Sequence, residues 1–302
     1  MPDPMPGPMP DPTPATTLGL PGYTIKTYRY LRLAMVAMLV LLGAGVLIER
    51  FHNAAGCFQP SISDYYYTPA QAVFVGGLVT IGICMIVLKG STEWEDILLN
   101  LGGMLAPVVA FVPTPQGATC SSVPNIAPDI AANVANNIPA LFVAGVVGVA
   151  TVLVLARRDR ARSANNWNYR HTIGLLVALA VLLGGFAWYF WGRESFIGNA
   201  HYAAALPLFG AIVAVAVINA REFTRKRTGA MAAGNVARNR YFLVAVLMVV
   251  LPVAEYLVST VVTWRHVVLW EEITVLTLFA AFWLMQTEEL WSEGVRGTEA
   301  SS

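Results

Sequence analysis

The amino-acid sequence predicts an all-α membrane protein: a polytopic helix bundle with about eight transmembrane helices. Hydrophobic residues make up 56% of the 302 positions and charged residues only 12%, whereas about 25% of a soluble domain is charged. Several nearly uncharged runs of about 18 residues or more are long enough to cross a hydrocarbon core of roughly 30 Å as a helix. The net charge of +1 provides no basic surface, so membrane lipids are the expected partners and nucleic acid is not.

Composition divides the chain into three parts. Residues 1–25 are predicted to be a disordered cytoplasmic tail, because proline stands at every even position from 2 to 14 and cannot donate a backbone hydrogen bond. No basic segment precedes an apolar core near the start, so this tail is not expected to be a secretory signal peptide. Residues 26–287 hold the predicted membrane domain, and residues 288–302 form a short cytoplasmic tail.

Eight apolar segments are the predicted spans. The third begins at a sequence typical of a capping box, Thr92 with Glu95 three residues later, and continues to about Val112. The acidic residues that follow Thr92 favour a helix N-terminus there because of the helix dipole. The other spans are predicted at about 33–48, 70–88, 138–156, 172–191, 200–219, 241–262 and 267–285.

Small residues and proline predict how some of these helices pack. Gly76, Gly77 and Gly82 lie in the second span, where small side chains allow two helix backbones to approach closely. Pro107 lies inside the third span and removes one helical hydrogen bond, so it predicts a kink.

The distribution of Lys and Arg predicts the orientation. If the N-terminus is cytoplasmic, all but three of the 19 Lys and Arg residues fall in cytoplasmic segments, and the exceptions are Arg50, Arg193 and Arg265. Positive charge is concentrated in cytoplasmic loops, so both termini are predicted to be cytoplasmic. A multi-pass protein of the plasma membrane is the corresponding expectation.

The segment between the first two spans carries more polar chemistry than a connector requires. Residues 56–77 read GCFQPSISDYYYTPAQAVFVGG and contain two serine hydroxyl groups and a carboxylate, on Ser61, Ser63 and Asp64, followed by three consecutive tyrosines. The predicted topology places this segment on the outer side of the membrane. We therefore expect these three residues to contribute to a site that faces the extracytoplasmic side.

The three cysteines fit no zinc or redox motif, because they are far apart in the sequence. The topology places Cys57 and Cys120 on the same outer side, where oxidising conditions would allow a disulfide that ties the two loops together. Cys84 lies in the middle of the second span and is expected to be a small packing residue.

Three further ionisable residues lie toward the outer ends of predicted spans. His201 opens the sixth span, Glu255 lies in the outer half of the seventh, and Glu272 begins the eighth. An ionisable group within the hydrocarbon is costly and usually faces the bundle interior or a wet cavity. With Ser61, Ser63 and Asp64, they are the candidates for an outward-facing polar site.

These residues leave several functions open, and they do not establish whether the protein is an enzyme. A lipid or another envelope amphiphile could bind at the outer site, or the polar residues could form a closed network in a scaffold protein. A metal-dependent membrane hydrolase would use zinc, with His201 as the best ligand candidate, although no helix carries two His at metal-binding spacing. A proton-coupled transporter would use Glu255 as its proton carrier. No catalytic residue is assigned.

The sequence resembles a family of uncharacterised bacterial multi-pass membrane proteins. The motif residues are SISDYYYTP at 61–69 and FVG at 74–76; in that family a Ser-Ile-Ser-x-Tyr-Tyr-x-Thr-Pro loop runs into a Phe-Val-Gly helix. His201 at the start of a later helix and Glu272 at the start of the last also match. The resemblance implies a multi-pass topology and supports these site residues, and it implies no particular activity.

A more distant resemblance is to the alkaline ceramidase and progestin-receptor-like membrane hydrolases, which also have an outer-facing cluster of Ser, Asp and His. Those proteins typically carry paired His residues on a late helix, and this chain has no such pair. The resemblance implies the zinc-dependent hydrolase alternative.

Overall fold

A computed structural model describes residues 22–52, 56–116, 129–162, 169–228, 239–262, 264 and 266–296. Within these residues the protein contains eight α-helices, one short 3-10 helix and no strand. The predicted all-α helix bundle is confirmed. Seven of the described helices are long and apolar enough to cross a membrane, so the chain is an integral membrane protein with several spans.

The described elements match the predicted spans closely. Each predicted span coincides with one α-helix to within one residue or lies inside a longer one, because polar flanking residues continue the same helix. Helix α1 begins inside the segment predicted as a tail, and residues 1–21 lie outside the described residues. The elements are α1 (Gly22–His52), η1 (Ser63–Tyr67), α2 (Gln71–Val87), α3 (Glu93–Phe111), α4 (Ile130–Arg162), α5 (Tyr169–Trp191), α6 (Arg193–Thr228), α8 (Arg240–Val261) and α9 (Val267–Glu289).

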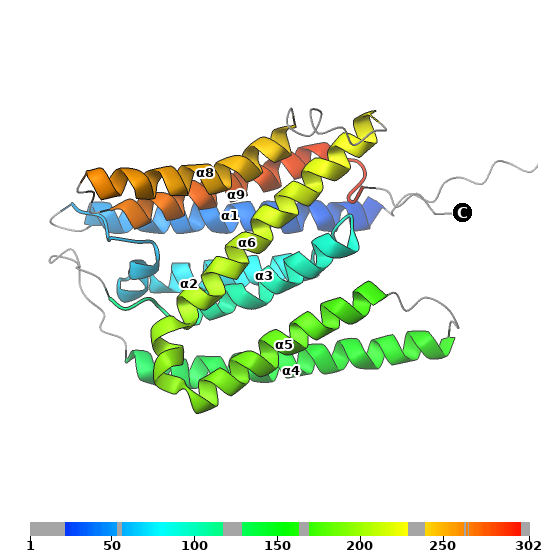
Figure 1. Ribbon diagram of the computed structural model, residues 1–302, viewed down its shortest axis with the longest axis horizontal. Helices are drawn as coiled ribbons and strands as arrows, with labels where there is room; N and C mark the ends of the chain where they lie inside the picture. The colour runs from blue at the N-terminus through cyan, green and yellow to red at the C-terminus, as the bar shows by residue number, and fades with distance from the viewer. Residues whose placement is uncertain are drawn as a thin grey trace, which may run out of the picture.

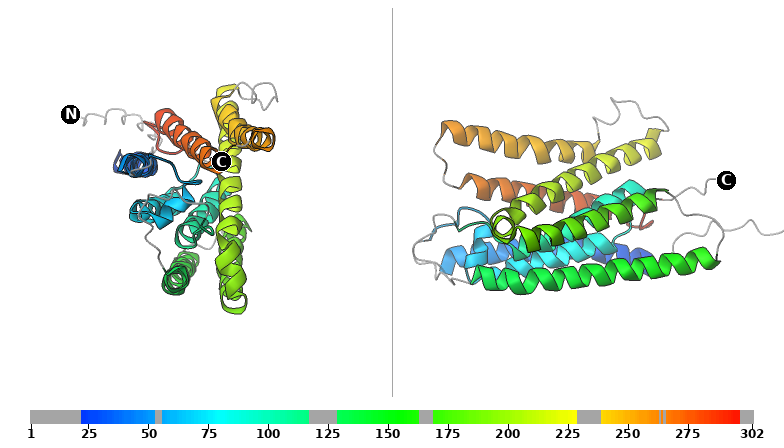
Figure 2. Two further views of the ribbon diagram at one scale, coloured as in Figure 1. Left: turned by 90° about the vertical axis from the view of Figure 1, so that its left-hand side faces the viewer. Right: turned by 60° about the horizontal axis from the view of Figure 1, so that its bottom comes forward.

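Successive helices run in opposite directions along the long axis of the bundle (Figures 1 and 2). One end holds η1 and the first residues of α6 and α9. The opposite end holds the first residues of α3 and α8 and the segment that follows α9. We call the end with η1 the outer end and the opposite end the inner end.

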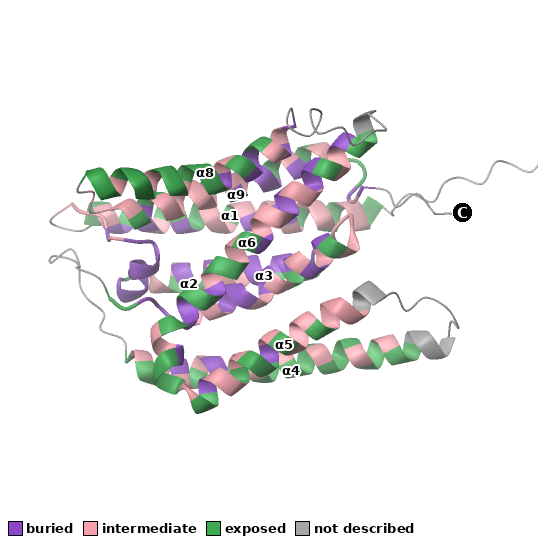
Figure 3. Ribbon diagram, in the orientation of Figure 1, coloured by how far each residue is buried: buried purple, intermediate pink, exposed green. Residues whose placement is uncertain are grey.

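Helix α3 is central and the α4–α5 hairpin is peripheral. Helix α3 contacts α2, α4, α5 and α6, and 56% of its most apolar 18-residue window is buried, against 6% for α4 and 6% for α5. In Figure 1 the hairpin lies at the edge of the bundle, below α3. Most of the buried surface in Figure 3 accordingly lies on the helices around α3, and α4 is largely exposed.

Glycine brings α2 and α3 into close contact, as the sequence led us to expect. A Cβ atom added at Gly82 would lie 2.8 Å from the carbonyl oxygen of Gly103 and 3.2 Å from Cδ of Pro107. A Cβ atom added at Gly103 would lie 2.6 Å from the carbonyl oxygen of Gly82. A Cβ atom added at Gly76 has no neighbour within 4 Å, so not every glycine of α2 takes part in a close helix contact.

Helix α2 is shorter than the other spans because the chain enters the bundle before the helix begins. Its 17 residues extend about 26 Å at 1.5 Å per residue, less than the roughly 30 Å hydrocarbon core. The preceding η1 segment is buried, and Tyr65, Tyr66 and Tyr67 are each at most 3% exposed. Non-helical backbone is tolerated at membrane depth where protein surrounds it, so η1 and α2 complete this crossing together.

Candidate functional site

Five of the six polar site candidates lie together at the outer end, and Glu255 lies apart from them. Four of the five are buried and Glu272 is half-buried. With Thr114 they form what we call the outer polar cluster: Ser61, Ser63, Asp64, Thr114, His201 and Glu272.

A directed chain of hydroxyl groups ends at Asp64. Ser61 Oγ donates to Asp64 Oδ2 at 2.8 Å, so its single proton is used there. Ser63 must then donate to Ser61, 2.9 Å away, and Thr114 must donate to Ser63, 3.1 Å away. Each hydroxyl therefore has a fixed role as donor and acceptor, and the carboxylate of Asp64 accepts from Ser61 within the same segment.

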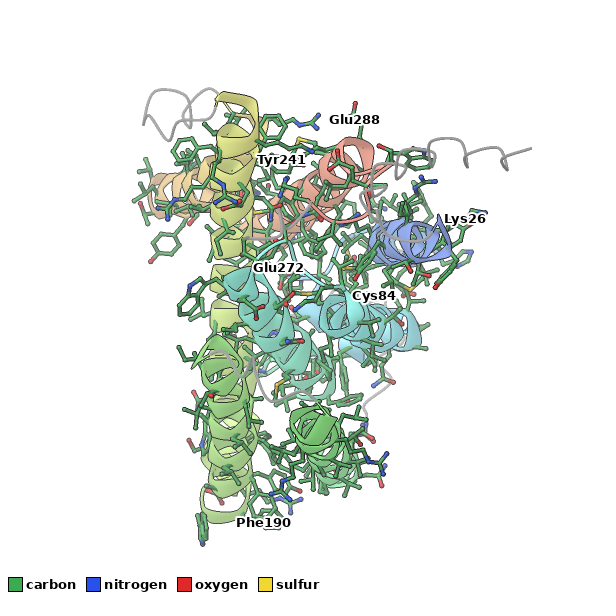
Figure 4. The ribbon with its side chains drawn as sticks, turned by 90° about the vertical axis from the view of Figure 1, so that its right-hand side faces the viewer. Lys26, Cys84, Phe190, Tyr241, Glu272 and Glu288 are labelled. Carbon is green, nitrogen blue, oxygen red and sulfur yellow. The ribbon has the colours of Figure 1, made fainter. Side chains whose placement is uncertain are left out.

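Helix α9 holds the η1 segment through two hydrogen bonds at its first turns. The backbone N–H of Ile62 donates to the carboxylate of Glu272, and the backbone N–H of Leu269 donates to the carbonyl oxygen of Pro60 at 3.0 Å. Glu272 thus accepts from a backbone donor at the start of η1, where a negative charge is favourable. Its place in the bundle, facing the interior, is visible in Figure 4.

His201 is connected to the same cluster through the segment after α3. Its Nδ1 lies 2.8 Å from the carbonyl oxygen of Val112, and a carbonyl can only accept, so Nδ1 carries the proton. Two residues further on, Thr114 bonds Ser63 through its hydroxyl and accepts from Tyr67 Oη at 2.6 Å through its carbonyl oxygen. The segment 112–114 therefore bridges α6 and η1.

Glu255 does not belong to this cluster. It is half-buried on α8 and accepts a hydrogen bond from Thr274 Oγ1 at 2.8 Å. Thr274 follows Glu272 by two positions, about 200° around helix α9, so these two side chains leave α9 on nearly opposite faces. Glu255 therefore connects α8 to α9, away from η1.

The zinc ligand set of the hydrolase alternative is not assembled in the part of the chain that the structure describes. No group of three or more His, Cys, Asp and Glu there is placed to hold a metal ion, whereas a catalytic zinc site takes three protein ligands. His201, the best ligand candidate, donates its Nδ1–H to the carbonyl oxygen of Val112, which leaves Nε2 as its one possible ligand atom.

The structure supports the predicted disulfide for one of its two cysteines. Cys57 is disulfide-bonded, and Cys84 is a buried free thiol, as predicted for a packing residue. Cys120 lies outside the described residues, so its pairing with Cys57 remains a prediction.

A second polar network lies at the inner end, and it is buried more completely than the outer cluster. Glu95 on α3 is 1% exposed and accepts from Asn219 Nδ2 at 2.7 Å and from Gln286 Nε2 at 3.3 Å. Its other carboxylate oxygen accepts from the backbone N–H of Ser91 at 2.7 Å. Three helices and the α2–α3 turn therefore meet at one carboxylate.

Two arginines and a second glutamate complete this inner network. Arg32 Nε donates to Gln286 Oε1 at 2.9 Å, and Arg296 holds both carboxylate oxygens of Glu289 at 2.9 and 2.6 Å. Burial alone would lower the pKa of Arg296, but its hydrogen bond and charge pairing with Glu289 outweigh burial and raise the pKa. The charges balance, since Arg32 and Arg296 face Glu95 and Glu289. We call this the inner polar network: Arg32, Glu95, Asn219, Tyr241, Gln286, Glu289 and Arg296.

The segment after α9 takes part in this network, although the sequence suggested only a short tail. The carbonyl oxygen of Gly294 accepts from Arg32 Nη2 at 2.7 Å, and Gly294 adopts a positive φ of 75° that lets the chain turn back. Arg296 is 6% exposed. Residues 290–296 therefore pack against the inner ends of the helices.

Sequence reasoning interpreted Glu95 only as part of a helix cap and did not find this network. The cap itself is confirmed, because the backbone N–H of Glu95 donates to Thr92 Oγ1 at 3.2 Å. One sequence pattern could have predicted the network. Four spans each carry a polar residue at a similar depth from the inner side: Arg32, Glu95, Asn219 and Gln286.

A cavity of about 1700 Å³ lies between α3 and the peripheral α4–α5 hairpin, and we call it the lateral cleft. Parts of α2 and α6 also line it. Its walls along the membrane-spanning length are mainly apolar, and they include Leu101, Leu105, Phe111, Leu141, Leu182 and Pro207. No residue of the outer polar cluster, and not Glu255, lines it among the described residues.

Comparison of the chain with protein-family models, with curated proteins and with solved structures finds no match.

Proposed function

We propose that this integral membrane protein binds a membrane lipid, or another amphiphile with long apolar chains, in the lateral cleft. The observation that carries this proposal is the size and lining of the cleft. Its volume of about 1700 Å³ exceeds the roughly 300–1,000 Å³ of a site for a drug-sized ligand. Its apolar walls are membrane-spanning helices, so acyl chains are the molecules that its surroundings supply.

This proposal moves the ligand site away from the outer end. The outer polar cluster is occupied by its own hydrogen bonds, and its role in our proposal is to hold η1 between α3, α6 and α9. Neither the hydrolase nor the transporter alternative is favoured by a specific observation, since the cleft is lined neither by His201 nor by Glu255.

Filling the cleft with an indole ring is expected to expel the lipid. Gly148 lines the cleft, and a Cβ atom added there meets nothing within 4 Å. For Gly148→Trp we expect about a tenfold loss of co-purified lipid, equivalent to about 1.4 kcal/mol of binding free energy. Native mass spectrometry of the detergent-purified protein measures the lipid bound per chain.

Gly43→Trp is the matched control, because Gly43 is also exposed on a span, has no neighbour within 4 Å and does not line the cleft. This variant should retain the lipid content of the parent. Equal lipid content in the two variants would contradict a ligand site in the cleft.

We also propose that the protein resides in the plasma membrane with both termini in the cytoplasm, on the strength of its Lys and Arg distribution. In intact cells, a membrane-impermeant maleimide should label Glu194→Cys, at the outer end, above the level of the parent chain. Arg225→Cys, on an exposed side chain at the inner end, should be labelled only after lysis. The reverse pattern would refute the orientation.

We retain the kinship with the bacterial multi-pass family as a proposal as well. It is supported by the motif at residues 61–69 and 74–76, whose serines and aspartate form the outer polar cluster.

A further inference from the structure

The lateral cleft has charged groups at one end only. At the inner end its lining includes Lys89, Glu93, Asp96 and Asn100 from the α2–α3 turn and the first turns of α3. Toward the outer end the polar lining consists of the amide of Asn137, which accepts from Asn136 at 3.3 Å. A lipid in the cleft would therefore meet charge at the inner end and apolar side chains over most of its length.

The depth of the charged end matches that of a lipid headgroup. Trp94 lies between the charged residues in the sequence and is 45% exposed, and exposed tryptophan is typical of the membrane–water interface. Helix α3 begins at Glu93, so the residues before Asn100 lie within about two turns of the helix N-terminus. The acyl chains would extend from there along the apolar walls.

The charges at this end favour an ammonium group beside a phosphate. Lys89 Nζ pairs with Asp96 Oδ2, and the Lys89 side chain is 54% exposed, so it has further donors for a phosphate. Lys89 and Asp96 thus place one positive and one negative charge side by side. A zwitterionic headgroup can place its cation beside Asp96 and its phosphate beside Lys89.

A primary ammonium is favoured over a quaternary one. Its N–H groups donate charge-assisted hydrogen bonds to a carboxylate, and a trimethylammonium group has no N–H to donate. Asp96 Oδ1 accepts from the backbone N–H of Gly90. A carboxylate can accept about four hydrogen bonds, so Asp96 retains lone pairs that can accept from a bound ammonium group.

Asn100 provides a polar group at the level of the glycerol backbone. It follows Asp96 by four positions, so it lies on the same face about 6 Å deeper. Its side chain is exposed in the cleft and makes no described hydrogen bond within the protein. An amide exposed to hydrocarbon is unfavourable, and an ester carbonyl of a bound lipid is an acceptor that would satisfy it.

We propose that the lateral cleft selects a phospholipid whose headgroup carries a primary amine beside its phosphate. The headgroup lies at Lys89 and Asp96, and the ester region lies at Asn100. This inference rests on the proposed lipid-binding function and adds the headgroup class and the end of the bundle at which it binds.

The test uses the full chain in nanodiscs made from equal amounts of phosphatidylethanolamine, phosphatidylcholine and phosphatidylglycerol, followed by native mass spectrometry of the lipids that remain bound after release. We expect the ratio of bound phosphatidylethanolamine to phosphatidylcholine to exceed the bulk ratio by about tenfold. Asp96→Asn, which can still accept from Gly90, should lower this ratio by roughly three- to tenfold. Glu288→Gln, at an exposed carboxylate outside the cleft lining, should leave it unchanged.

The possible failures are distinguishable. If the parent chain retains lipid but in bulk proportions, or enriches phosphatidylglycerol, the headgroup inference is overturned and lipid binding stands. If it retains no lipid, both proposals fail. Asn100→Leu should reduce bound lipid of all three headgroups alike, and a change in headgroup ratio without a change in amount would contradict its assignment to the ester region.

Discussion

Glu95→Ala is expected to destabilise the protein by about 3–5 kcal/mol, the usual cost of removing one partner from a buried charged network. The substitution leaves Arg32 and Arg296 with one carboxylate, Glu289, between them at the inner end. It also removes the acceptor of Asn219 and Gln286, whose amide groups then lose a buried partner. Thermal unfolding in a fixed detergent, followed by intrinsic tryptophan fluorescence, measures the change.

Glu288→Ala is the matched control, because it removes the same carboxylate from an exposed position at the inner end of α9. The Glu288 side chain is 73% exposed and pairs with Arg240, and Figure 4 shows it pointing away from the bundle. An exposed ion pair contributes no more than about 1 kcal/mol. Equal unfolding temperatures for the two variants would show that the inner polar network does not contribute to stability as its burial implies.

Gly82→Ala is expected to destabilise the protein by about 1–3 kcal/mol, the typical cost of overpacking a closely packed contact. The added methyl group would lie 2.8 Å from the carbonyl oxygen of Gly103, so α2 and α3 must separate to accommodate it. The added methyl group would also lie 3.2 Å from Cδ of Pro107, which is on α3 like Gly103. This second contact limits a sideways shift of α2 against α3. The same unfolding measurement reports the loss.

Gly76→Ala provides the comparison within α2. An added Cβ there meets nothing within 4 Å, and alanine is favoured over glycine inside a helix by about 1 kcal/mol. This variant should be as stable as the parent or more stable. If Gly82→Ala behaves in the same way, the close α2–α3 contact is not a constraint on the fold.

The fold class and the positions of the helices could be predicted because they depend on local sequence. The apolar runs give the spans, and Thr92 with Glu95 gives the start of α3, which the structure confirms. The bounds of α2 were also predicted to within one residue. The burial of η1 before this helix could not be predicted, because it depends on contacts with α9, which is about 200 residues away in the chain.

The depth of the candidate residues along the spans was predictable, and their hydrogen-bond partners were not. Depth along the spans placed Asp64, His201 and Glu272 at one end. Which polar groups pair depends on how the helices rotate and pack, and the sequence does not encode this locally. Depth alone grouped Glu255 with the residues of the outer polar cluster, whereas its hydrogen bond is to Thr274, on another face of α9. The lateral cleft was not predictable either, because it arises where the α4–α5 hairpin packs loosely against α3.

The position of Arg32 has a consequence for biosynthesis. Its acceptors, Gln286 Oε1 and the carbonyl oxygen of Gly294, are 254 and 262 residues further along the chain. At a synthesis rate of roughly 5–20 residues per second, about 13–50 s pass between translation of the first span and of these partners. The guanidinium of the first helix therefore lacks these two acceptors until α9 and the segment that follows it have been translated, and the inner end of the bundle can close only after that point.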